Sequence, residues 1–130
     1  MLRASVLVGA LSGAPSTIPA LVTGRSPLDA ARAAGELLGR AGLLRGAAAH
    51  AGVTVGWTLL LDRLLPRRHR VAWGATAGLA IAALDLSIAE RRFPAIAALP
   101  RVPQVADHLA FGALVGAGLG DRPRRSSGGP

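Results

Sequence analysis

Three ionisable side chains stand inside the apolar stretches of this 130-residue chain: His50, Asp85 and His108. Such groups are rare within helices that cross a bilayer. An imidazole near a carboxylate in low dielectric has the parts of a proton relay, or of a site for a substrate or a coupling cation. A hydrogen-bond network that only holds helices in register is the alternative interpretation, and it needs no ligand. The sequence leaves both interpretations open.

The same three residues also form a formal ligand set for iron or another metal. Two histidines and one carboxylate can hold a metal ion, and two histidines at similar depth can ligate a haem. However, the chain contains no His-x3-His, His-x2-Glu or Cys-x2-Cys-His motif and no cysteine at all. We therefore predict no metal, no cofactor and no catalytic residues.

Small residues four apart accompany these polar groups. Residues separated by four or seven positions share a helical face, so Asp85 shares a face with Gly78, and His108 shares one with Gly112. Gly-x3-Gly lets two helix backbones approach closely, which favours helix association where lipid replaces water. Each apolar stretch has such a pair, which predicts eight helix-packing positions: Gly9, Gly13, Gly52, Gly56, Gly74, Gly78, Gly112 and Gly116.

Four apolar segments approach the length of about 20 residues that a membrane-spanning helix needs. They cover residues 4–23, 42–62, 71–89 and 104–120. The first is free of charge to residue 24, which favours a retained helix over a cleaved signal peptide. We predict an all-α fold, with one domain over residues 1–120: an integral membrane bundle of four antiparallel transmembrane helices.

The connections between these segments are predicted to lie at the membrane surface. Residues 27–39 predict a short interfacial helix, with Pro27 at its first position and Asp29 in its first turn. Residues 94–103 hold three prolines and predict an irregular interfacial loop. Residues 121–130 contain mostly arginine, serine, glycine and proline, and predict a disordered basic tail.

Antiparallel spans bring the polar residues toward one membrane face. His50 lies near the start of the second segment, Asp85 near the end of the third and His108 near the start of the fourth. At about 1.5 Å rise per residue, His50 and Asp85 lie roughly 6–12 Å inside that face. We therefore predict a polar pocket to which all four segments contribute, lined by His50, Asp85, His108, Ser16, Thr17 and Thr54.

Composition and charge indicate which classes of molecule this chain contacts. Hydrophobic residues make up 51% of the chain and charged residues 17%, which is less charge than a soluble domain normally carries. The net charge of +8 comes from arginines that flank the apolar segments. This pattern favours membrane lipids as partners and argues against nucleic acid. Gly-x3-Gly pairs on outer faces also permit, without requiring, a homo-oligomer or contact with another membrane protein.

Four short segments carry a resemblance: residues 9–13 (GALSG), His50 with Gly56, residues 73–78 (WGATAG) and residues 107–112 (DHLAFG). The late His-Leu-x-x-Gly step into a glycine-rich last helix is similar to that of small bacterial inner-membrane proteins, broadly of the YagU-like kind. The arginine-only, alanine-rich usage resembles that of high-GC bacteria, actinobacteria among them. The resemblance implies four membrane helices in the cell inner membrane and brings no established activity.

The dense arginine cluster at residues 63–70 favours cytoplasmic termini by the positive-inside rule. Together these features predict a multi-pass membrane protein that is structural or a subunit of a membrane assembly. A small solute transporter or proton-conducting protein that uses the His/Asp pocket is the alternative.

Overall fold

Residues 11 and 13–120 are described by the computed structural model, and every regular element in this part of the chain is helical. The predicted all-α class is thus confirmed. The elements are α2 (Ala14–Val22), α3 (Asp29–Ala34), η1 (Gly35–Leu38), α4 (Leu43–Leu64), α5 (Arg70–Arg92), α6 (Pro94–Ala97) and α7 (Arg101–Leu119). Gly9, one of the predicted packing positions, lies outside the described residues.

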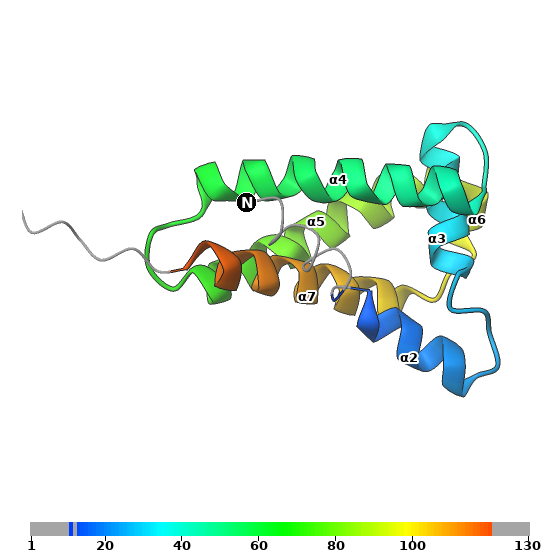
Figure 1. Ribbon diagram of the computed structural model, residues 1–130, viewed down its shortest axis with the longest axis horizontal. Coiled ribbons are helices and arrows are strands. Elements are labelled where there is room, and N and C mark those ends of the chain that lie inside the picture. The colour runs from blue at the N-terminus through cyan, green and yellow to red at the C-terminus, as the bar shows by residue number, and fades with distance from the viewer. Residues whose placement is uncertain (1–10, 12, 121–130) are drawn as a thin grey trace, which may run out of the picture.

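Three long helices form the body of the molecule. α4, α5 and α7 have 22, 23 and 19 residues, which corresponds to about 33, 35 and 28 Å at 1.5 Å per residue. They run along the long axis, while α3, η1 and α6 gather at one end and the α4–α5 turn lies at the other (Figure 1). α2 packs against α7 and diverges from the three long helices toward the α3 end (Figure 1).

Proline and its neighbours set the ends of the long helices. Leu65, which precedes Pro66, is extended and ends α4, and Phe93, which precedes Pro94, is extended and ends α5. The pyrrolidine ring disfavours helical backbone at the residue before it, so both breaks follow from the sequence. Pro94 then begins α6, where the missing N–H costs nothing.

The expected irregular loop over 94–103 is wrong in part. Residues 94–97 form α6, and α7 begins at Arg101 with Pro103 inside its first turn. Proline is tolerated there because the first amides of a helix have no partner within the helix. The side chain of Glu36 in η1 also supports α6, since its Oε2 accepts a hydrogen bond of 2.9 Å from the Ala95 amide.

α5 and α7 touch backbone to backbone through glycine. A Cβ added to Gly74 would collide with the carbonyl oxygen of Gly112, and a Cβ added to Gly112 would collide with that of Gly74. Gly78 meets the His108 carbonyl and Gly116 meets the Arg70 carbonyl in the same way. The two Gly-x3-Gly pairs therefore face each other within one chain, which fixes the antiparallel register of α5 and α7.

The other predicted glycines differ. Among the described residues, no atom lies within 4 Å of a Cβ added to Gly13, Gly52 or Gly56, so the packing role of these glycines stays a prediction. Gly46, which was not predicted, lies against the Ala31 carbonyl and lets α3 rest on the start of α4. α4 instead joins α5 and α7 through large side chains, and the core cluster consists of Leu61, Leu65, Ile81, Phe111 and Val115.

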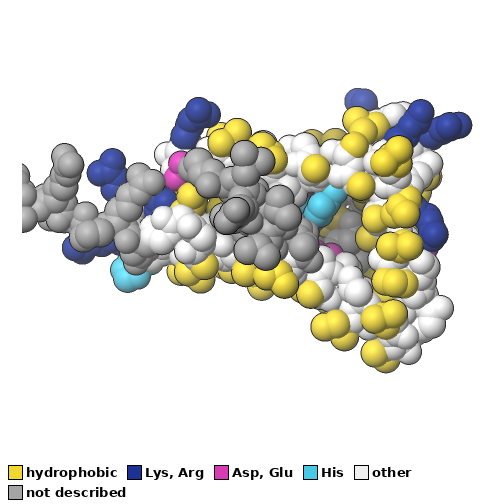
Figure 2. All heavy atoms as spheres, in the orientation of Figure 1, with side chains coloured by type: hydrophobic (Ala, Val, Ile, Leu, Met, Phe, Trp, Pro, Cys, Tyr) yellow, Lys and Arg dark blue, Asp and Glu magenta, His cyan; other side chains and the backbone are white. Residues whose placement is uncertain are grey.

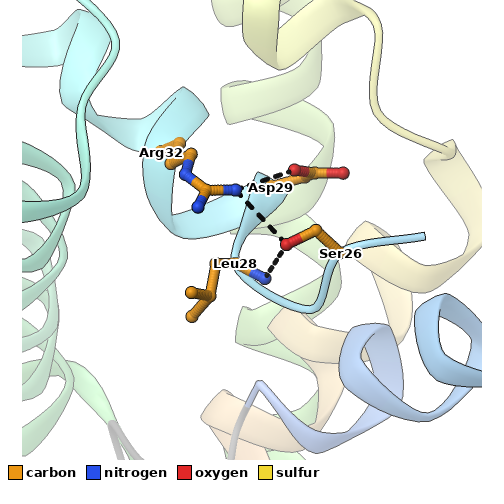
Figure 3. Close-up of polar contacts among 4 residues, drawn as sticks. All are labelled: Ser26, Leu28, Asp29 and Arg32. Atoms are coloured by element: carbon orange, nitrogen blue, oxygen red, sulfur yellow. Dashed lines mark hydrogen bonds and ion pairs between the residues drawn. The ribbon is translucent and has the colours of Figure 1, made fainter.

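The helical structure expected over residues 27–39 is observed as α3 and η1, and it begins at Asp29 rather than at Pro27. The placement of this segment at a membrane interface stays a prediction. Its start is organised by Ser26, whose Oγ accepts a hydrogen bond from the Leu28 amide at 3.2 Å (Figure 3). Nη1 of Arg32 lies 3.3 Å from Ser26 Oγ and 3.4 Å from Oδ1 of Asp29, which is one turn earlier on α3. These groups are exposed, so the ion pair contributes at most about 1 kcal/mol.

Among the described residues, one helix is long and apolar enough to cross a membrane, over Arg70–Ala89 of α5. A bundle of four transmembrane helices is therefore a prediction that rests on the sequence.

Candidate functional site

Asp85 on α5 and His108 on α7 are in direct contact. Oδ2 of Asp85 lies 3.0 Å from Nε2 of His108, and both side chains are partly exposed, with 37% and 24% of their surface accessible. The contact follows from the register that glycine sets, because Gly78 lies against the backbone of His108 two turns before Asp85 on α5. The two residues are 23 positions apart in the sequence, and their contact joins α5 to α7.

The other ring nitrogen determines the protonation of this pair. Nδ1 of His108 lies 2.7 Å from the carbonyl oxygen of Gln104, one turn earlier on α7. A carbonyl oxygen only accepts hydrogen bonds, so Nδ1 must carry a proton and donate it. Nε2 then either donates to an ionised Asp85 or accepts from a protonated Asp85. In both cases one further proton is shared between Asp85 and His108.

A second polar contact lies one position earlier on α7. The Ser16 amide at the start of α2 donates a hydrogen bond of 2.9 Å to Oδ1 of Asp107. Asp107 thus links α7 to α2, whereas the adjacent His108 faces α5.

Asp107 is a site residue that the sequence did not predict. Adjacent helical side chains point about 100° apart, so Asp107 and His108 cannot face each other. The same geometry means that an acid next to His108 must face a different helix. Asp107 could have been predicted as a site residue because it is an acidic residue inside an apolar segment.

The remaining predicted pocket residues take different places. The hydroxyls of Ser16 and Thr17 donate to the Gly13 carbonyl of their own helix, at 3.1 and 2.8 Å. Thr54 is buried on α4, with 6% of its surface exposed, and His50 on the same helix is exposed. The structure thus joins Asp85 to His108 and Ser16 to Asp107, and no described hydrogen bond connects Thr17 or Thr54 to either pair.

This arrangement can hold a proton and can tie helices together. Within residues 11 and 13–120, no group of three or more His, Cys, Asp or Glu side chains is placed to hold a metal ion. The chemistry available at the candidate site is therefore that of a carboxylate–imidazole pair beside a second carboxylate.

Comparison with protein-family models, with curated proteins and with solved structures gives no match to this chain. The resemblance to YagU-like inner-membrane proteins therefore stays a prediction from the sequence.

Proposed function

We propose that this chain is an integral membrane protein that serves as a structural element or subunit of a membrane assembly. The observation that carries the proposal is the distribution of apolar and charged side chains over the surface. On the face drawn in Figure 2, arginines lie toward both ends of the long axis, and apolar side chains are visible between them where described residues form the surface. A bilayer has the same order of layers, with an apolar core between two charged surfaces.

Exposed large side chains line the middle of the long helices. They include Val55 (45% exposed) and Leu59 (46%) on α4, with Leu79 (45%) and Leu84 (47%) on α5. Only 22% of the Arg70–Ala89 segment is buried inside the protein, which differs from the core helix of a soluble protein. Apolar surface of this extent on a small protein marks contact with lipid or with another protein.

Helix length agrees with this placement. The 22 and 23 residues of α4 and α5 extend over about 33 and 35 Å, against about 30 Å for the hydrocarbon core. The acidic groups between the charged ends are Asp85 and Asp107, and both have a partner on another helix. Satisfied polar groups inside the bundle are what a bilayer requires.

A topology experiment tests the proposal, because the chain has no cysteine and single-cysteine variants need no altered background. Arg40→Cys precedes α4, Arg68→Cys lies in the α4–α5 turn and Leu79→Cys lies in the middle of α5. With a membrane-impermeant maleimide on intact cells, we expect Arg40→Cys to react at once and Arg68→Cys only after the membrane is opened. Leu79→Cys should stay unreactive until detergent is added.

Equal reactivity of all three positions, together with release of the protein from membranes by alkaline carbonate, would contradict membrane insertion. Reversed reactivity of Arg40→Cys and Arg68→Cys would keep the membrane proposal and overturn only the predicted cytoplasmic termini.

The shared proton of Asp85 and His108 supports a second candidate, a proton-conducting protein or small transporter. Substitution of Asp85 by Asn distinguishes the two. The neutral amide of Asp85→Asn can donate to Nε2 of His108 and keeps one hydrogen bond, but it cannot hold the shared proton. Under the structural proposal, we expect this variant to lose about 1 kcal/mol of stability, the usual loss for a weakened hydrogen bond. Proton entry into liposomes should equal that of empty liposomes for both parent and variant.

Asp107→Asn is the matched control, since Asp107 lies next to His108 but bonds to Ser16. Imidazole ¹⁵N shifts should show a neutral His108 in Asp85→Asn and an unchanged ring in Asp107→Asn. Proton flux in the parent that disappears in Asp85→Asn would replace the structural proposal by the conducting one, as would a rise in melting temperature together with that loss.

A further inference from the structure

The C-terminal end of α5 carries a surface hollow that the Asp85–His108 site does not use. Ser87, Ile88, Arg91 and Arg92 line it, and its volume is about 370 Å³. Four-residue spacing stacks Ser87 with Arg91 and Ile88 with Arg92 on adjacent strips of the helix. The hollow therefore combines two guanidinium groups with one apolar wall.

The two arginines are exposed, and no ion pair joins either of them to a side chain that the structure describes. Each guanidinium offers five N–H donors in a planar fork that matches the oxygens of a phosphate group. Ser87 contributes no donor, because its hydroxyl already donates to the Leu84 carbonyl at 2.8 Å. An anion in the hollow would thus be held by Arg91 and Arg92.

The apolar side of the hollow extends along α5 from Ile88 toward Leu84, away from the two arginines. Ile88 is 53% exposed and Leu84, one turn earlier on α5, is 47% exposed. A ligand that satisfies both parts of this surface has a phosphate at one end and a hydrocarbon chain at the other. A free phosphate ion would leave the apolar strip uncovered, and a neutral lipid would leave the two guanidinium groups without a counter-ion.

We propose that the hollow formed by Ser87, Ile88, Arg91 and Arg92 binds the phosphate of an anionic phospholipid, with its acyl chains along Leu84 and Ile88. This inference rests on the proposed membrane location and adds a defined lipid site to it. The helix C-terminus also favours nearby arginines, but that effect alone requires neither the hollow nor the apolar strip.

Native mass spectrometry of the full chain in detergent tests the site, with phosphatidylglycerol and phosphatidylcholine as probes. We expect the parent to keep one phosphatidylglycerol at a concentration where phosphatidylcholine is lost. Arg91→Gln/Arg92→Gln should weaken that binding at least tenfold. The matched control is Arg67→Gln/Arg68→Gln, which removes the same charge from a second arginine pair, in the α4–α5 turn, and should keep the bound lipid.

The other outcomes each overturn the proposal. Equal losses in both double variants would mean general attraction of anionic lipid to a basic protein. Equal binding of the two lipids, both of which carry a phosphate, would mean that Arg91 and Arg92 do not select an anionic headgroup. Displacement of the lipid by millimolar inorganic phosphate, with Leu84→Gln/Ile88→Gln binding unchanged, would assign the site to free phosphate. The cysteine labelling described above is independent of all these results, so a failed lipid site and a failed membrane proposal can be told apart.

Discussion

Substitution of Gly112 by alanine should separate α5 from α7, whereas the same substitution at Gly52 should not destabilise the protein. The added methyl group at Gly112 would overlap with the carbonyl group of Gly74 and the amide of Gly78, which are backbone atoms and cannot rotate away. Overpacking of a tight contact costs about 1–3 kcal/mol. We expect Gly112→Ala toward the upper end, because relief requires the movement of a whole helix.

Gly52 is the matched control within the same chain. Its added methyl group meets no atom of the described residues within 4 Å, and alanine is a better helix former than glycine by about 1 kcal/mol. Gly52→Ala should therefore be neutral or stabilising. Unfolding in a denaturing detergent, followed by tryptophan fluorescence, measures both variants against the parent.

Equal stability of Gly112→Ala and the parent would contradict the close α5–α7 contact. A destabilised Gly52→Ala would show that a group outside the described residues occupies that face of α4, and cross-linking at rising protein concentration would then test for a second copy of the chain there. The pair of substitutions thus tests the contact within the chain and a contact between chains in one series.

The sequence predicted the use of glycine at the α5–α7 contact but not which pairs would meet. Gly52 and Gly56 have the same spacing as Gly74 and Gly78, and the spacing alone does not distinguish them. What distinguishes them is the partner: α7 offers a second glycine pair in matching register, and large side chains such as Leu61 hold α4 against the other two helices. Helix pairing therefore depended on positions far apart in the chain.

The candidate site was predictable where face and depth could be combined. Asp85 and His108 were placed on glycine faces at similar depth, and the structure brings them to 3.0 Å. Thr54 was placed by the same argument, but its helix α4 stands further from the α5–α7 seam, so depth alone did not bring Thr54 to the Asp85–His108 pair. The sequence also could not show that Asp107 would meet the backbone amide of Ser16, because any residue can supply that group.

Charge clusters were the least predictable feature. The sequence shows residues 63–70 as one dense cluster of arginines and does not distinguish its members. Arg67 and Arg68 are exposed, but Arg70 is only 2% exposed and begins α5 beneath α7. Its carbonyl lies against Gly116, so the close approach of α7 covers this residue and buries its charge.

Removal of the Asp62 carboxylate from beside Arg70 should accordingly have a large effect. Nη1 of Arg70 lies 3.5 Å from Oδ1 of Asp62, and the two side chains are 3% and 24% exposed. Asp62→Ala takes the opposite charge away from a buried guanidinium, a change that costs about 3–5 kcal/mol in buried pairs. Because Asp62 keeps some contact with solvent, we expect a loss of about 3 kcal/mol.

Three further variants separate charge from packing in the same unfolding assay. Asp62→Asn keeps the volume of the side chain and removes its charge, so it should lose nearly as much stability as Asp62→Ala. Arg68→Gln removes an exposed charge two residues from Arg70 and should change stability by less than about 0.5 kcal/mol. Asp62→Leu combined with Arg70→Met should recover most of the loss, because an apolar pair of similar volume replaces a buried ion pair at little cost. If Asp62→Asn is as stable as the parent, the charge of Asp62 contributes nothing to stability, which would contradict the prediction.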